Sequence, residues 1–279
     1  MKRKLAALIT CLMIFVSQVM TTSYAGVYDG YVRDRASLNA DNVLEKNYKI
    51  FSPDLSEDTE LIETKKDLAD EAARTYESVA IDEAHFPSEG FRNLVSENFD
   101  TDGDGTLSSD EIRGAKIVNS EGDYEIDSLK GIEYLANLKK LNVYSDTLSE
   151  VNITKNPELQ ILSLSGDGAI TSIDTSRNAK LRVFNVTNSS LESVDLTKNP
   201  ELRIFTVPLT SLRSVDLRNN PYLKRCEVPG TQVKELDVTH NKRLQALNVE
   251  NTSVSKVDTS NNRDLYEFYF NSTPISSVD

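Results

Sequence analysis

Residues 244–257 read LQALNVENTSVSKV, and the spacing of the apolar residues in this stretch decides the fold. Leu247 and Val249 alternate with polar residues, and this period of two predicts a short strand with one buried face. Leu244 recurs 21 residues earlier as Leu223 and 21 residues later as Leu265. A repeat of about 20 to 30 residues predicts a solenoid, because one coil is too small to bury its own apolar face.

Three rows of residues keep this period through the C-terminal half of the chain. The first row is Leu138, Leu159, Leu181, Leu202, Leu223, Leu244 and Leu265. The second is Val151, Ile173, Val194, Val215, Leu236, Val257 and Val278, and the third is Asn156, Asn178, Asn199, Asn220, Asn241 and Asn262. The asparagine side chains fall where a turn needs hydrogen bonds to nearby backbone groups. The last coil stops in mid-repeat at Asp279 without a polar cap, so we expect the native chain to continue, and the alternative is that the open end meets a partner.

The stretch LQALNVENTSV is close to the pattern L-x-x-L-x-L-x-x-N-x-L, and the segment that starts at Leu181 agrees with it. The second half of each coil, such as VDLTKN from Val194, also looks extended and leaves no room for a helix. Residues 126–279 therefore resemble the short-repeat bacterial leucine-rich-repeat proteins, including internalin-like surface proteins. This resemblance implies a mainly β fold, a leucine-rich-repeat solenoid of about seven coils with stacked short parallel strands. A right-handed parallel β-helix, which also stacks short strands, is the alternative.

Residues 100–111 read DTDGDGTLSSDE and match the EF-hand calcium loop at every ligand position. Ca²⁺ prefers about six to eight oxygen ligands, and the loop offers oxygens in the expected order. Gly105 occupies the position of the sharp turn. The predicted ligands are the side chains of Asp100, Asp102 and Asp104, the carbonyl of Thr106, Ser108 through a water, and both carboxylate oxygens of Glu111.

The flanks of this loop predict a small helical EF-hand module over residues 81–125. Phe91, Leu94 and Val95 fall at helical spacing before the loop, and Ile112 begins a shorter apolar stretch after it. The loop resembles the single EF-hand that precedes the repeats in some secreted bacterial leucine-rich-repeat proteins. EF-hands usually pair and dockerin modules carry two loops, but this sequence shows one. We therefore expect a modest affinity for Ca²⁺, roughly 10⁻⁴ to 10⁻³ M, which suits a structural clamp.

Residues 1–25 have the composition of a secretory signal peptide. A basic start precedes an apolar run, and the small residues that end at Ala25 suit signal peptidase. An uncleaved anchor is the alternative, although the run is short for a membrane span. No later segment is apolar enough to cross a bilayer. We therefore predict a secreted or cell-surface protein with no membrane insertion after signal cleavage.

The chain is acidic, with a formal net charge of −13, which argues against nucleic acids and anionic membranes as partners. Cleavage after Ala25 would remove three basic residues and no acidic residue. Residues 26–80 are polar and rich in acids, with a weak apolar face. This stretch is predicted to be an acidic linker that is partly helical or disordered.

The sequence contains no catalytic motif such as G-x-S-x-G or H-E-x-x-H, and no phosphate-binding loop. Cys226 takes a core position of its repeat and is predicted to be a small core hydrophobe. A row of aspartates recurs once per coil, on the outward side, at Asp174, Asp195, Asp216, Asp237, Asp258 and Asp279. Such a ladder is expected to bond turn groups or solvent, with calcium recruitment as the alternative. We therefore predict that the chain is not an enzyme.

The outward positions of the predicted strands form the concave face, where a solenoid normally binds its partner. Ile161, Val183 and Ile204 would form an exposed apolar stripe there, and exposed apolar patches mark interaction sites. Arg225 and Tyr269 extend the same face, and the five residues are the predicted contact with a protein or glycan ligand. The alternatives are that the N-terminal arm covers the stripe, or that β-branched residues only favour strands.

The sequence thus predicts a calcium-binding, secreted or cell-surface protein whose repeats bind a protein or a glycan without catalysis. The alternative is an accessory, dockerin-like module of an extracellular polysaccharide-degrading assembly. A second calcium loop or an attached catalytic domain would favour that alternative.

Overall fold

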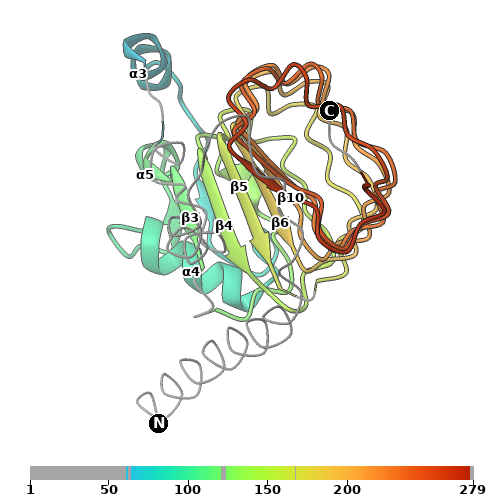
Figure 1. Ribbon diagram of the computed structural model, residues 1–279. Coiled ribbons are helices and arrows are strands. Elements are labelled where there is room, and N and C mark those ends of the chain that lie inside the picture. Colours follow the sequence, from blue (N-terminus) through green and yellow to red (C-terminus); the bar gives the residue numbers. More distant parts are fainter. Residues whose placement is uncertain (1–60, 62–63, 121–123, 167, 277–279) are drawn as a thin grey trace, which may run out of the picture.

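Short parallel strands stack along one side of a coiled chain and form one eight-stranded sheet (Figure 1). The structure, a computed structural model, describes residues 61, 64–120, 124–166 and 168–276. The predicted signal peptide and the linker up to residue 60 lie outside the described residues. The strands are β3 (Ile117–Asn119), β4 (Lys140–Tyr144), β5 (Ile161–Ser165), β6 (Val183–Thr187), β7 (Ile204–Thr206), β8 (Arg225–Glu227), β9 (Ala246–Asn248) and β10 (Glu267–Tyr269). They follow one another across the sheet in chain order, so the predicted mainly β solenoid is confirmed.

Each strand directs one row of its side chains into a continuous apolar core. The strands pair in register, so that Leu162, Phe184, Phe205, Cys226 and Leu247 take the same position in successive strands. All five are fully buried, and the rings of Phe184 and Phe205 stack with their centroids 5.7 Å apart. Burial raises the pKa of the Cys226 thiol, which is therefore a core hydrophobe, as predicted.

The asparagine row joins neighbouring coils. Asn220 is fully buried, and its Nδ2 donates to the carbonyl oxygens of Leu196 at 3.1 Å and Asn199 at 2.8 Å. The other members of the row, Asn156, Asn178, Asn199, Asn241 and Asn262, make the same pair of bonds. The backbone bonds predicted for this row are therefore present, but they run between coils rather than within one turn.

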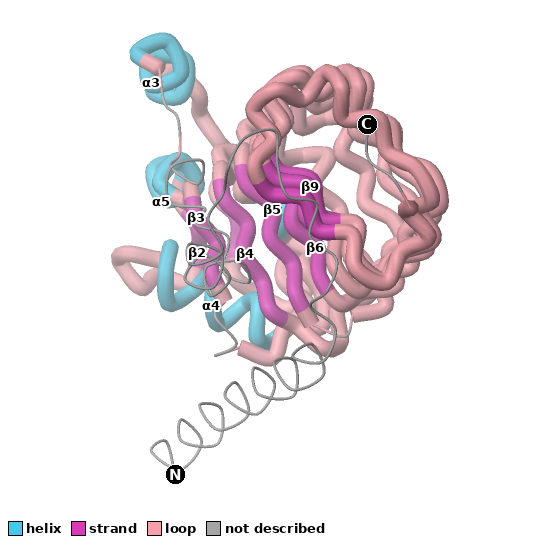
Figure 2. The backbone as a smooth tube through the Cα atoms, in the orientation of Figure 1, coloured by secondary structure: helices cyan, strands magenta, loops and turns pink. Residues whose placement is uncertain are grey.

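The second half of each coil consists of turns and bends rather than strands (Figure 2). Within the described residues, the β-bridges between these halves are isolated ones, from Ser172 to Ser193 and from Ser189 to Thr210. A β-helix needs a second continuous sheet, so this alternative does not describe the chain.

The aspartate row shapes the turns of these second halves. Oδ1 of Asp216 accepts a hydrogen bond from the backbone N–H of Arg218 at 3.0 Å. Bonds from the side chain and backbone of Arg218 lower the pKa of Asp216 to about 2. The same bond, donated by the backbone N–H two residues later in the chain, is accepted by Asp174, Asp195, Asp237 and Asp258. The predicted bonding of this row to turn groups is confirmed for these members, and Asp279 lies outside the described residues.

The helical module before the repeats shares its core with the solenoid. Its elements are β1 (Val79–Ala80), α4 (Glu89–Phe99), β2 (Thr106–Leu107) and α5 (Ser109–Gly114), and a short helix η2 (Ile132–Tyr134) leads into the first coil. Phe86, Phe91 and Leu94 belong to the same buried cluster as the leucines of the repeats. The module and the solenoid are therefore packed as one unit.

Strand β3 is shared between the predicted EF-hand module and the solenoid sheet. Residues 117–119 fall within the predicted EF-hand module, yet β3 pairs in parallel with β4 at the edge of the solenoid sheet. An edge strand exposes unpaired backbone groups, and covering that edge protects the sheet. The module thus supplies the first strand of the solenoid and covers its N-terminal end.

A further helix, α3 (Lys65–Ala72), lies in the stretch predicted to be a partly helical linker. Thr64 caps it, because its Oγ1 accepts a bond from the backbone N–H of Asp67 at 3.1 Å. Within the described ranges, no helix has the length and apolar character needed to cross a bilayer.

Candidate functional site

The predicted calcium loop lies between α4 and α5, and buried side chains fix its N-terminal end. Phe91, Leu94 and Val95 are buried on α4, as their helical spacing predicts. Gly103 and Gly105 have φ values of +72° and +80°, a backbone conformation that glycine adopts at little cost. The chain therefore turns sharply at Gly105, where the EF-hand pattern requires it.

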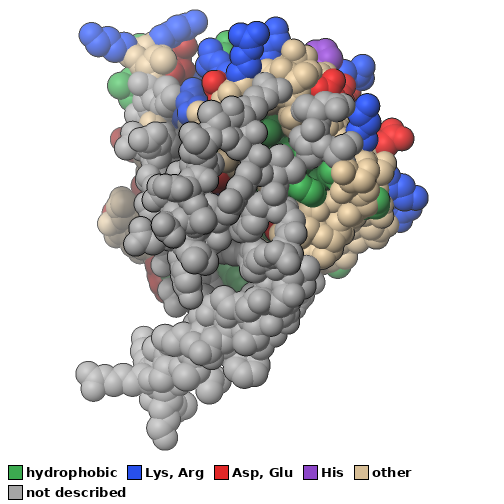
Figure 3. Space-filling model, viewed as in Figure 1, with side chains coloured by type: hydrophobic (Ala, Val, Ile, Leu, Met, Phe, Trp, Pro, Cys, Tyr) green, Lys and Arg blue, Asp and Glu red, His purple; other side chains and the backbone are tan. Residues whose placement is uncertain are grey.

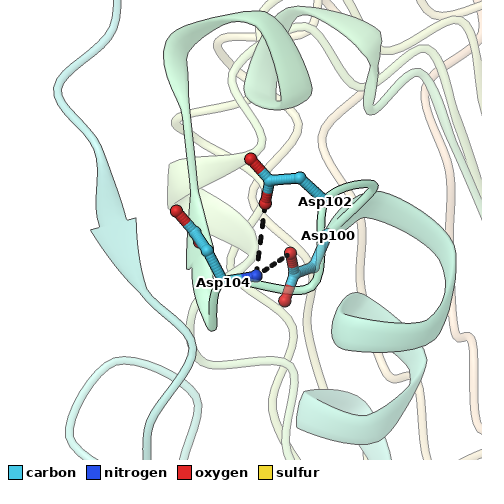
Figure 4. Close-up of side chains that lie close together, drawn as sticks. All are labelled: Asp100, Asp102 and Asp104. Carbon is cyan, nitrogen blue, oxygen red and sulfur yellow. Dashed lines mark hydrogen bonds between the residues drawn. The ribbon is translucent and has the colours of Figure 1, made fainter.

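Three carboxylates of the loop converge (Figure 4). One oxygen from each of Asp100, Asp102 and Asp104 lies within 4.8 Å of the others. The backbone N–H of Asp104 donates to Oδ1 of Asp100 and to Oδ1 of Asp102, both at 3.2 Å. The N–H of Gly105 donates to Oδ2 of Asp100 at 3.1 Å. The loop backbone thus holds like charges close together, and a divalent cation at this place would neutralise them.

The pairing of β1 with β2 directs the carbonyl of Thr106 into the loop. Ala80 lies opposite Thr106, and the N–H of Ile81 donates to the carbonyl of Gly105 at 2.9 Å. Bonded and non-bonded pairs alternate along antiparallel strands, so Ala80 and Thr106 form a non-bonded pair. The N–H of Thr106 donates to Oδ1 of Asp104 at 2.8 Å, and its carbonyl faces the same side. This orientation is the one that a carbonyl ligand at loop position 7 requires.

The last two predicted ligands cap α5 and are not among the converging carboxylates. Oγ of Ser108 donates to Oε2 of Glu111 at 2.9 Å. Oε1 of Glu111 accepts bonds from the N–H and Oγ1 of Thr101 at 2.6 and 2.7 Å. Hydrogen bonds from Ser108 and Thr101 lower the pKa of Glu111 to about 2, so this carboxylate is ionised at neutral pH. A cation in the loop would have to compete with these bonds for Glu111.

The outer face of the eight-stranded sheet, which we call the sheet face, carries the predicted partner-binding residues. Alternation along each strand places two rows on this face. The first row is Ile117, Lys140, Ile161, Val183, Ile204, Arg225, Ala246 and Glu267, and the second is Asn119, Asn142, Ser163, Asn185, Thr206, Glu227, Asn248 and Tyr269. The sheet therefore brings all five predicted residues to one surface.

The apolar stripe on the sheet face is buried, so its predicted exposure is wrong. Ile161, Val183 and Ile204 are 2, 1 and 4% exposed and form a cluster separate from the main core. Leu61 packs against this cluster. Strand alternation predicts which face a side chain takes, but it does not reveal what a distant segment places over that face. Leu61 belongs to the N-terminal arm, which is the alternative cover that the sequence leaves open.

The C-terminal end of the sheet face is polar and partly exposed. Arg225 and Tyr269 are half-buried there. Nη1 of Arg225 lies 2.8 Å from Oε1 of Glu227 and 3.7 Å from Oε2 of Glu267. Burial raises the pKa of Glu227, against the opposing effect of Arg225. This end of the face combines an aromatic ring with charged groups that are held in place by one another.

A row of basic residues borders the sheet face. This row was not predicted from the sequence. Strand register aligns the positions just before the first row, and five of the first six are basic, at Lys116, Lys139, Arg182, Arg203 and Lys224. Lys and Arg side chains are visible at the top of the molecule as drawn (Figure 3), although Lys139 and Arg182 of this row are themselves buried. The available signal was that Lys or Arg directly follows four of the seven repeat leucines.

The fold is similar to solved structures of internalins from Listeria monocytogenes. The functional domain of InlJ has 20% identity and a TM-score of 0.58, over 74% of this chain and 50% of that chain. Internalin C2 has 16% identity and a TM-score of 0.63, over 74% and 93% of the two chains. InlP has 16% identity and a TM-score of 0.56, over 74% and 67%. This chain thus spans half of the InlJ chain that it matches.

These similarities identify the fold as a leucine-rich-repeat solenoid of the internalin type. No family model matches the chain, and no curated protein matches it.

Proposed function

We propose that the chain is a secreted or cell-surface protein whose leucine-rich repeats bind a protein ligand without catalysis. The observation that carries this proposal is the sheet face, where eight strands in register present two rows of side chains outside the main core. A continuous surface of this kind is the usual binding site of a solenoid. The aspartate row is engaged in turn bonds.

The C-terminal end of the sheet face favours a protein as the ligand. Tyrosine and arginine are enriched among the residues that dominate binding at protein interfaces. Tyr269 and Arg225 are partly exposed there, and neighbouring acids fix the guanidinium of Arg225. A glycan ligand remains the second possibility from the sequence, because an exposed aromatic ring also stacks on sugars.

Substituting Tyr269 by alanine should weaken ligand binding by at least about tenfold, because it removes the aromatic contact. The ligand is unidentified, so the probes are peptides selected from a random library on the immobilised full chain. Their affinities for the variant and the parent chain are then compared by fluorescence anisotropy. The matched control is Tyr222→Ala, because Tyr222 is 45% exposed and stacks under Arg243, away from the sheet face. Equal losses in both variants, or no loss at Tyr269, would count against the proposal.

We also propose that Ca²⁺ binds the loop at residues 100–111 and acts as a structural clamp. The residues fit a hard cation, because three carboxylates converge and strand pairing turns the Thr106 carbonyl away from β1, to the side on which its N–H bonds Asp104. Ser108 and Glu111 would complete the set of calcium ligands once their hydrogen bonds at the N-terminus of α5 are broken. The strand opposite the loop is β1 and not a second calcium loop, so the dockerin-like alternative gains no support.

Calorimetric titration of the full chain with CaCl₂ should show one site with a dissociation constant of roughly 10⁻⁴ to 10⁻³ M. Glu111→Gln should weaken that site about tenfold or more, because it removes the bidentate ligand. The matched control is Asp110→Asn, since the Asp110 side chain is 88% exposed and is not at a ligand position. Absence of heat and of thermal stabilisation at millimolar Ca²⁺ would reduce the loop to an acidic turn.

A further inference from the structure

Residues 64–76, which we call the strap, lie against the edge of the sheet where the strands begin. Glu71 on α3 receives Nζ of Lys139 at 3.1 Å and Nζ of Lys116 at 2.9 Å. Asp67 receives Nζ of Lys180 at 2.9 Å. These contacts tie one short helix to three successive coils of the solenoid.

The C-terminal part of the strap continues the same attachment. Nη2 of Arg74 lies 2.9 Å from Oε1 of Glu158, whose Oε2 lies 2.6 Å from Nζ of Lys180. The hydroxyl of Tyr76 donates to Oδ1 of Asn137 at 2.8 Å. The acids of the strap thus face bases of the solenoid, and Arg74 faces an acid, so the charges are complementary along the whole contact.

Apolar burial contributes little to the attachment of α3, although Tyr76 at the end of the strap packs against the main core. The only buried residue of α3 is Glu71, and Leu68 is 47% exposed. An isolated helix of this length is unstable in water. The pairs that Lys180 and Arg74 make are partly exposed and screened by salt, whereas Glu71 and Lys139 form a largely buried pair. The helix is therefore held mainly by ion pairs, for which a ligand with charges of its own can compete.

The sheet face next to the strap keeps polar groups without partners. Oδ1 of Asn185 and Oγ1 of Thr206 are buried, and neither has a hydrogen-bond partner in the part of the chain that the structure describes. Thr206 is only 7% exposed. Both belong to the second row of this face, beside the stripe that Leu61 contacts. Leu61 therefore contacts the apolar stripe but leaves these hydrogen bonds unmade, and a better-matched ligand would form them.

We propose that the strap is autoinhibitory: its ion pairs hold Leu61 against the sheet face, and a ligand segment with acidic side chains and an aliphatic anchor must displace Leu61 and the strap. This inference rests on the proposed function, because it takes the sheet face to be the binding surface. It also defines the ligand chemistry. The basic residues at the sheet edge fit acids, and the stripe of Ile161, Val183 and Ile204 fits a leucine-like anchor.

The first test is the rate of trypsin cleavage after Lys66 in the full chain, followed by mass spectrometry. The double variant Asp67→Asn/Glu71→Gln should be cleaved about tenfold faster, because cleavage follows the fraction of chains with an open strap. The matched control is Asp70→Asn, an exposed acid on the same helix, which should leave the rate unchanged. A wild-type rate in the double variant would overturn the proposal.

A second double variant separates strap release from loss of the helix itself. Lys139→Gln/Lys180→Gln removes the opposing charges and leaves α3 unaltered, so it should raise the cleavage rate similarly. A rise confined to the substitutions in α3 would assign the effect to the helix and overturn the proposal.

The second test uses a dye-labelled peptide of residues 61–76 as the competing ligand. It should bind the full-length Asp67→Asn/Glu71→Gln variant at least about tenfold more tightly than wild type, because the resident strap no longer competes. Equal affinities would overturn autoinhibition. The proposed function is tested separately. It fails if no library peptide loses affinity in the Tyr269→Ala variant, whether or not the strap is released.

Discussion

Replacing Asn220 with alanine should lower the free energy of unfolding by about 4 kcal/mol, as measured by urea denaturation. The side chain is fully buried and donates to the carbonyls of Leu196 and Asn199. Alanine removes both bonds and leaves two carbonyl oxygens buried between coils. Each such group costs about 1 to 3 kcal/mol, and the loss of the amide leaves a small cavity in addition.

The neighbouring residue provides the control for this prediction. Asn219 has the same side chain but is exposed. Its substitution by alanine should change stability by less than about 0.5 kcal/mol. If the two variants unfold at the same urea concentration, the asparagine row does not join the coils as described.

Substitution of Gly90 by alanine should destabilise the chain by about 3 kcal/mol, because it forces the helical module away from the solenoid. A Cβ atom on Gly90 would lie 2.2 Å from the carbonyl oxygen of Glu125 and 2.6 Å from its carbon. These are backbone atoms, which cannot move aside as a flexible side chain does. The expected measurement is a fall in the melting temperature of the full chain, followed by circular dichroism.

The glycine that ends α5 separates this clash from a general effect of alanine in a helix. A Cβ on Gly114 would meet nothing within 4 Å. Gly114→Ala should therefore leave the melting temperature unchanged or raise it slightly, because alanine favours helix more than glycine does. A melting temperature for Gly90→Ala equal to that of wild type would show that α4 does not pack on Glu125.

The solenoid was predictable because its signal is repeated. Each coil restates the same alternation of apolar residues, so the register of Leu162, Phe184 and Phe205 follows from their spacing. The convergence of three carboxylates in the predicted calcium loop was predictable for a similar reason. Its ligand order is local, and the structure brings Asp100, Asp102 and Asp104 together within one turn of chain.

The partners of several residues were not predictable, because they lie on other coils or outside the repeats. The sequence predicts that Asn220 bonds within its own turn, but in the structure its side chain donates to a carbonyl of the preceding coil. Strand β2 of the calcium loop pairs with Val79–Ala80, which has no calcium-loop pattern of its own.

The sequence by itself determined the solenoid, the order of oxygens in the calcium loop, and the face of the sheet on which each side chain lies. These features depend on spacing along the chain, and spacing is written in the sequence. Only the tertiary structure decided that Ile161, Val183 and Ile204 are covered and that residues 64–76 attach to the sheet edge. The physical reason is that burial and ion pairing depend on which distant segments meet, and no periodic pattern encodes a contact that occurs once.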